Sequence, residues 1–152
     1  MIKKNYKKYN QGVFKPRNPD KCVTDSCVYR SGLELKFMRW CDNNSNVIMW
    51  GSESVVIPYT SPLDNKVHRY FVDNIVILKD ANIPNKRHKY LIEIKPSKQT
   101  QTPTTTNRKS KKNLLYEQLT YAKNTAKWNA AKKWCEKNNY EFKIITEKDL
   151  NI

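Results

Sequence analysis

Two apolar runs, residues 68–78 and 89–95, constrain the fold of this chain more than any other feature of its sequence. Both are rich in Ile, Val, Tyr and Phe, which favour strands, and a polar turn separates them. We therefore expect two neighbouring antiparallel strands. Each run is interrupted by charge that a buried strand seldom carries: Asp73 in the first, and Glu93 with Lys95 in the second.

The spacing of these charges points to phosphodiester chemistry. Side chains alternate along a strand, so Glu93 and Lys95 face the same way. With Asp73 on the neighbouring strand, two carboxylates and an ammonium can hold a divalent cation and a water molecule, which suits hydrolysis of a phosphodiester. The Glu-x-Lys tripeptide alone is a weak signal, because a same-face ion pair on an exposed strand is common. Asp73 is what turns it into a candidate metal-dependent nuclease site.

The charge of the chain indicates the partner. There are 29 Lys and Arg residues against 14 Asp and Glu, a formal net charge of +15. Such a field attracts polyanions, and we expect double-stranded DNA bound mainly through its phosphates. An acidic membrane surface is the competing partner, but no apolar run approaches the roughly 20 residues of a spanning helix, and no secretory signal begins the chain. The four cysteines lack zinc-ligand spacing, so we expect free thiols in a reducing cytoplasm.

Two basic segments are candidates for contact with DNA. We expect residues 1–28 to form an arm outside a domain of residues 29–152; the arm either follows phosphates or is a solvated tail. Residues 96–113 contain no acid and no aliphatic side chain, and for this long loop DNA contact is favoured over a simple connector. The candidate DNA-binding residues are Lys3, Lys4, Lys7, Lys8, Lys98, Arg108, Lys109, Lys111 and Lys112.

The remaining elements follow from periodicity and capping. A helix is expected over residues 31–43, where Ser31 and Glu34 form a capping-box pattern, and short strands over 47–50 and 54–59. A long helix over 114–138 and a last strand over 140–146 complete the order αβββαβ. The expected apolar face of the long helix consists of Leu114, Leu115, Leu119, Tyr121, Ala122, Ala126, Trp128, Ala130 and Cys135, with Lys123, Asn124 and Lys127 opposite.

This order, with Asp73 on one strand and Glu93-Ile94-Lys95 on the next, resembles the restriction-endonuclease-like, or PD-(D/E)xK, superfamily. The resemblance implies an α/β fold with a mixed central sheet flanked by helices, and Mg²⁺ as cofactor with Mn²⁺ as a substitute. It also implies metal ligation by Asp73, Glu93, the Ile94 carbonyl and Glu34, the acid on the first helix, with Lys95 as the catalytic amine. Val72 stands where the family has its Pro. Glu34 is either catalytic or only a helix cap.

More closely, residues 29–147 resemble the head-completion nucleases of T4-like tailed phages, through stretches such as YRSGLELKFMRWCD, LIEIKP and AKWNAAKKWCEKNNYEFKIITE. This implies a DNA nuclease of low sequence specificity that trims packaged DNA before head and tail join. Phage head or neck proteins would be its partners, in the host cytoplasm during assembly or in the virion. A junction-resolving or transposon-type endonuclease on the same core is an alternative. A non-catalytic DNA-binding head component is another.

Overall fold

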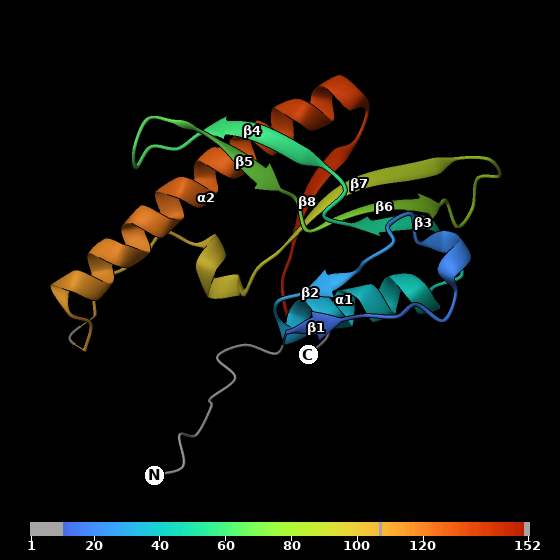
Figure 1. Ribbon diagram of the computed structural model, residues 1–152, viewed down its shortest axis with the longest axis horizontal. Helices are drawn as coiled ribbons and strands as arrows, with labels where there is room; N and C mark the ends of the chain where they lie inside the picture. The colour runs from blue at the N-terminus through green and yellow to red at the C-terminus, as the bar shows by residue number, and fades with distance from the viewer. Residues whose placement is uncertain (1–10, 107, 151–152) are drawn as a thin grey trace, which may run out of the picture.

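The computed structural model describes residues 11–106 and 108–150, and its centre is a mixed four-stranded sheet (Figure 1). The strand order is β3-β6-β7-β8; β6 is antiparallel to both of its neighbours, whereas β8 runs parallel to β7. Helices α1 and α2 flank the sheet, so the core order α1-β3-β6-β7-α2-β8 is the αβββαβ order predicted from the sequence. The bounds are α1 Gly32–Asn43, β3 Val47–Ser52, β6 Asn74–Lys79, β7 Arg87–Ile94, α2 Lys111–Asn138 and β8 Glu141–Ile145.

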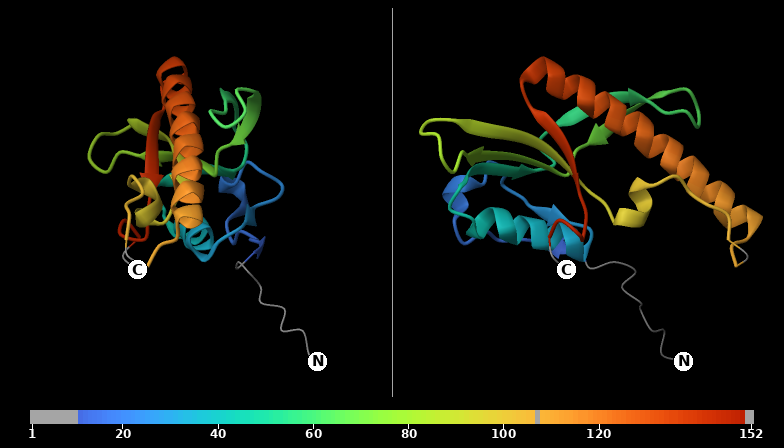
Figure 2. Two further views of the ribbon diagram at one scale, coloured as in Figure 1. Left: turned by 90° about the vertical axis from the view of Figure 1, so that its left-hand side faces the viewer. Right: turned by 180° about the vertical axis from the view of Figure 1, so that it is seen from behind.

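The two helices cover opposite faces of the sheet (Figures 1 and 2). Ile92 and Ile94 of β7 pack in the cluster that contains Phe37 of α1, whereas Leu91 packs in the cluster that contains Ala131 of α2. This division follows from the alternation of side chains along β7. The acids of the central strands therefore lie between two packed layers.

A hairpin is inserted between β3 and β6. Its strands, β4 (Val56–Thr60) and β5 (Val67–Phe71), form a separate two-stranded sheet that packs on α2. The single strand predicted over residues 68–78 is therefore wrong. The chain leaves the hairpin at Val72, whose N–H still bonds to Val55, and enters the central sheet at Asn74. Asp73 lies at this crossing between two sheets.

The segment before α1 also belongs to the folded domain. It contains β1 (Gly12–Val13), a short helix η1 (Pro19–Lys21) and β2 (Val28–Tyr29). Phe14 packs 6.1 Å from Trp50 between ring centroids, and the buried Asp42 carboxylate accepts the N–H groups of Arg17 and Asn18 at 2.9 and 3.0 Å.

Residues 11–28 are thus not the separate arm that we expected, because they share the core. Lys3, Lys4, Lys7 and Lys8 lie outside the described residues. All four cysteines are free thiols, as expected, and three of them are buried.

The predicted apolar face of α2 is only partly correct: Trp128 and Cys135 are buried as predicted, whereas Asn124, predicted on the opposite side, is also buried. Its buried residues are Asn124, Trp128, Ala131 and Cys135. Leu115 and Leu119, predicted to be buried, are 56% and 43% exposed. The reason is that the first turns of α2 project past the sheet and have no surface to cover (Figure 2). Within the described part of the chain, no helix is long and apolar enough to cross a bilayer.

Candidate functional site

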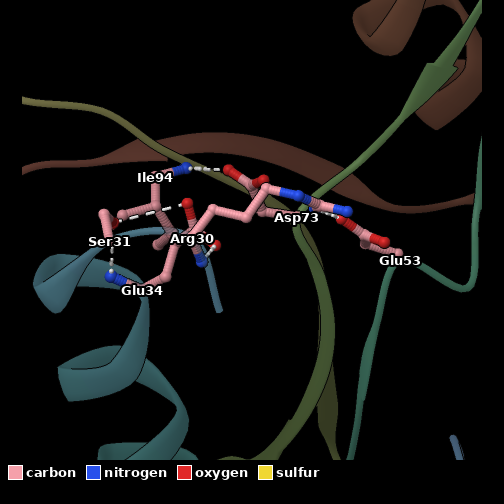
Figure 3. Close-up of polar contacts among 6 residues, drawn as sticks. All are labelled: Arg30, Ser31, Glu34, Glu53, Asp73 and Ile94. Atoms are coloured by element: carbon pink, nitrogen blue, oxygen red, sulfur yellow. Dashed lines mark hydrogen bonds and ion pairs between the residues drawn. The ribbon is translucent and has the colours of Figure 1, made fainter. Parts of the chain in front are cut away.

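The pairing of β6 with β7 brings Asp73 beside the Glu-x-Lys tripeptide. Asn74 is paired with Ile92, and the Ile94 N–H donates to Oδ2 of Asp73 at 2.7 Å (Figure 3). One carboxylate oxygen is thus hydrogen-bonded to the backbone of β7. Asp73, Glu93 and Lys95, which the sequence singled out, lie together.

Glu93 is held on two sides. It is 6% exposed, and Lys95 Nζ lies 3.4 Å from its Oε1 atom, as expected for side chains on one face of a strand. The buried Tyr70 hydroxyl donates to Oε2. Burial, followed by the nearby Glu93 charge, raises the pKa of Tyr70, so this hydroxyl keeps its proton. The Glu93 carboxylate therefore has a fixed orientation.

The site carries excess negative charge. Asp73 is partly accessible at its surface, but protein surrounds most of its carboxyl group, and this burial is the first cause of its strongly raised pKa. The charge of Glu93 is the second cause, and Glu34 raises the pKa further. The Ile94 N–H and the Lys95 ammonium oppose the shift without cancelling it. A divalent cation would relieve this repulsion.

Glu34 takes part in the N-terminal cap of α1 and also lies near the acids. The Ser31 hydroxyl accepts the Glu34 N–H at 3.1 Å, and Glu34 Oε2 accepts the Arg30 N–H at 2.9 Å, so the predicted capping pattern is present (Figure 3). The Glu34 charge nevertheless acts on Asp73. Arg30 reaches across the front of the site to an ion pair with Glu53. Helix capping and a place beside the acids are therefore compatible for Glu34.

Lys127 lies near the acids, a position that no sequence pattern predicted. It was expected on the solvent face of α2, but its Nζ atom lies 5.4 and 5.8 Å from the ring centroids of Tyr70 and Tyr59. Burial and then a neighbouring lysine lower its pKa, while Glu93 and Asp73 raise it. Lys127 is therefore a second ammonium group close to the acids. No local motif marks it, because α2 contains many lysines.

The oxygen donors at the site suit a Mg²⁺ ion that keeps several waters, rather than a metal ion enclosed by side chains alone. Among the described residues, no three His, Cys, Asp or Glu side chains are close enough to hold a metal ion by themselves. Mg²⁺, however, is typically bound through one or two carboxylates and keeps several waters. Asp73 and Glu93 supply two hard carboxylates, and the carbonyl of Ile94, the residue that follows Glu93, is a third oxygen donor.

Comparisons with known proteins agree with this geometry. A family model described as TnsA-like endonuclease N terminal matches residues 44–147, which is more than half of the chain. The chain belongs to the TnsA-like endonuclease family. It is also 38% identical over 144 residues to the head completion nuclease of Enterobacteria phage T4, covering 91% of this chain and 92% of that protein. The resemblance inferred from the sequence and the restriction-endonuclease-like fold are both confirmed.

The matched range shows which parts of the site belong to the TnsA-like endonuclease core. It includes Asp73, Glu93, Lys95 and Lys127 but begins after α1, so Glu34 lies outside it. The similarity to the phage T4 protein extends over nearly the whole chain.

The basic loop of this TnsA-like endonuclease follows β7 and contains a short helix, η2 (Ser97–Thr100). Lys98, Arg108, Lys111 and Lys112 are exposed, and contact with DNA stays a prediction for them. Lys109 is different, because its ammonium bonds to Glu117 Oε2 and to the Thr104 carbonyl, both at 2.7 Å. Its charge is already paired, which argues against a phosphate contact there.

Proposed function

We propose that the chain is a Mg²⁺-dependent DNA nuclease of low sequence specificity, with Mn²⁺ as a substitute, that acts in the completion of phage heads. One observation carries the chemistry: Asp73 lies hydrogen-bonded beside Glu93-Ile94-Lys95, with excess negative charge around it. Membership of an endonuclease family and the net charge of +15 support DNA as the substrate.

The proposed roles follow from position. Asp73, Glu93 and the Ile94 carbonyl would hold the ion, which when bound polarises the phosphate and lowers the pKa of a water molecule. Glu34, at the edge, would contact a metal-bound water. Lys95 would position the attacking water or stabilise the negative charge that develops on the oxygens of the phosphorane. Each of these groups is held by an element that packs on the central sheet.

Two residues missed by sequence reasoning have supporting roles in the proposal. Tyr70 would keep the Glu93 carboxylate oriented through its hydrogen bond. Lys127 would bring a second positive charge from α2, and its half-buried stem restrains the ammonium beside the acids. Fixed charges that need no reorganisation are the most effective way to stabilise a phosphoryl transition state.

The biological role comes from the relative. The phage T4 protein is named a head completion nuclease, and the similarity covers both chains almost completely. We therefore propose that this chain also acts during head assembly in the host cytoplasm, trimming packaged DNA in contact with phage head or neck proteins. The transposon-type alternative is less favoured, because the TnsA-like match is confined to residues 44–147.

Cleavage of supercoiled plasmid tests the proposal. Wild type should nick or linearise the plasmid with Mg²⁺ or Mn²⁺ and not with EDTA. Glu93→Gln and Lys95→Ala should each slow cleavage about 100-fold or more. Lys132→Ala, an exposed lysine of α2, is the matched control and should cut like wild type. If wild type never cuts while all the variants bind DNA equally, the chain is a non-catalytic DNA-binding head component.

A further inference from the structure

A cavity of about 610 Å³ lies between the loop that follows β7 and helix α2, and none of the candidate catalytic residues lines it. One wall is formed by η2 and the loop that follows it, and the other by the first half of α2. The volume is in the range of sites for small organic molecules and is far too small for a DNA duplex. A small molecule or an unpaired part of a polymer can enter it.

The lining has the chemistry that recognises a nucleotide. Two aromatic rings, of Tyr116 and Tyr121, come from α2, and Gln99, Gln101 and Asn124 contribute amides. Aromatic faces stack on unpaired bases, and amides bond to base edges. Asn124 is 6% exposed and lines the cavity. Its amide is of the kind that bonds to the edge of a base.

The cavity wall is fixed before any ligand arrives. The Lys109 ammonium bonds to Glu117 on α2 and to the Thr104 carbonyl in the loop, both at 2.7 Å. The ring of Tyr121 packs edge-on against Trp128, with 6.4 Å between their centroids. These contacts hold the loop on the helix, so the cavity is a preformed site.

Two independent elements connect the cavity to the acids. Lys98, which lines the cavity, follows Lys95 by three residues, a span of at most about 10 Å. On the opposite wall, Asn124 lies three residues before Lys127, less than one helical turn away. A phosphate bound at Lys95 and Lys127 therefore has its neighbouring nucleotide at the cavity.

We propose that this cavity receives an unpaired nucleotide next to the phosphate that is cut, so that duplex DNA with a single-stranded extension is the preferred substrate. The cleavage experiment below rests on the proposed nuclease function. The binding experiment does not, because it needs no cleavage. In this proposal Lys109 holds the loop against α2, and Lys98 forms an ion pair with the phosphate of the bound nucleotide.

Binding is tested with the full-length Glu93→Gln variant, which keeps the cavity but should not cut. The probe is a duplex carrying 2-aminopurine, either in a short single-stranded extension or within a blunt end. We expect fluorescence quenching by stacking only for the extension. Tyr116→Ala in the same background should weaken binding of the extended duplex about tenfold and leave the blunt duplex unchanged. Leu115→Ala, an exposed neighbour outside the cavity, is the matched control and should change neither.

Cleavage gives the second readout and separates the two proposals. Wild type should cut the extended duplex faster than the blunt one, and Tyr116→Ala should reduce that ratio toward one. Equal cleavage of both substrates without selective quenching overturns the cavity inference and leaves the nuclease standing. If wild type cuts nothing but the extension still quenches and depends on Tyr116, the nuclease proposal fails while the cavity stands as a nucleotide site.

Discussion

Asp73→Asn should make the metal-free protein more stable while it abolishes cleavage. The substitution keeps the size of the side chain, and the amide oxygen of the new residue can still accept the Ile94 N–H, which now bonds to Asp73 at 2.7 Å. What is lost is a negative charge that lies beside Glu93 in surroundings that raise the pKa of Asp73. The change therefore removes the cost of burying this charge together with its repulsion by Glu93 and Glu34.

The magnitude follows from Coulomb's law. Two unit charges about 6 Å apart repel by about 3 kcal/mol at an effective dielectric constant of about 20. Lys95 offsets part of this repulsion, so we expect a net gain of about 1–2 kcal/mol in the free energy of unfolding. For a chain of this size, each kcal/mol raises Tm by about 2–4 °C. The variant should thus melt about 2–8 °C above wild type in EDTA.

The pH dependence has a definite sign. Because folding raises the pKa of Asp73, the native metal-free protein holds this proton more tightly than the unfolded chain. Wild type therefore loses stability as the pH rises above about 4, the ordinary value of the carboxyl group. The difference in free energy of unfolding between Asp73→Asn and wild type should grow as the pH rises from about 4 to the raised pKa of Asp73. It should shrink again as the pH falls toward about 4.

Thermal unfolding followed by circular dichroism in EDTA and in Mg²⁺ is the assay. Ligand binding to the native state stabilises wild type by about 2.7 kcal/mol at a concentration 100 times Kd, and Asp73→Asn should gain much less. Asp25→Asn, at an exposed position, should behave like wild type in both buffers. The reasoning is refuted if Asp73→Asn is less stable than wild type in EDTA, or if Mg²⁺ raises its Tm as much as that of wild type.

Three further predictions address other parts of the molecule. Lys127→Met should slow plasmid cleavage at least about tenfold with an unchanged circular dichroism spectrum, because the apolar stem is kept and the charge is lost; an unchanged rate assigns Lys127 to packing alone. Asp42→Ala should cost about 2–3 kcal/mol in urea unfolding, because it leaves two backbone N–H groups without their buried acceptor; a loss below about 0.5 kcal/mol would contradict this. Replacing both Lys111 and Lys112 by Ala in the Glu93→Gln background should reduce the slope of log affinity against log salt by about 2, and an unaltered slope removes them from the DNA surface.

The acid site was predictable because it depends on short spacings. Glu93 and Lys95 share a face through strand alternation, and the antiparallel partner strand brings Asp73 to them. The break after Val72 was not predicted, because strand-forming side chains lie on both sides of Asp73 and Asn74. Where the chain changes partners depends on pairing with β3 and β4, which lie earlier in the chain.

The covered face of α2 shows the same limit. Apolar side chains occur along the whole length of the helix. Trp128 and Cys135 are buried because the sheet lies beside them, whereas Leu115 is exposed because the sheet ends before it. The place of Lys127 near the acids depends on that same docking. A single lysine among the many on this helix carries no local sign of its position.

Strand β8 has a consequence for the moment at which cutting can begin. It pairs in parallel with β7, placing Ile144 opposite Glu93, and the Ile145 carbonyl accepts the Lys95 N–H at 3.0 Å. Parallel pairing requires the whole crossover through α2. A chain still attached to the ribosome, with its residues up to Lys95 outside the exit tunnel, therefore lacks the hydrogen bond that holds the Lys95 backbone. If Lys95 acts as proposed, cleavage begins only after Ile145 has emerged and docked.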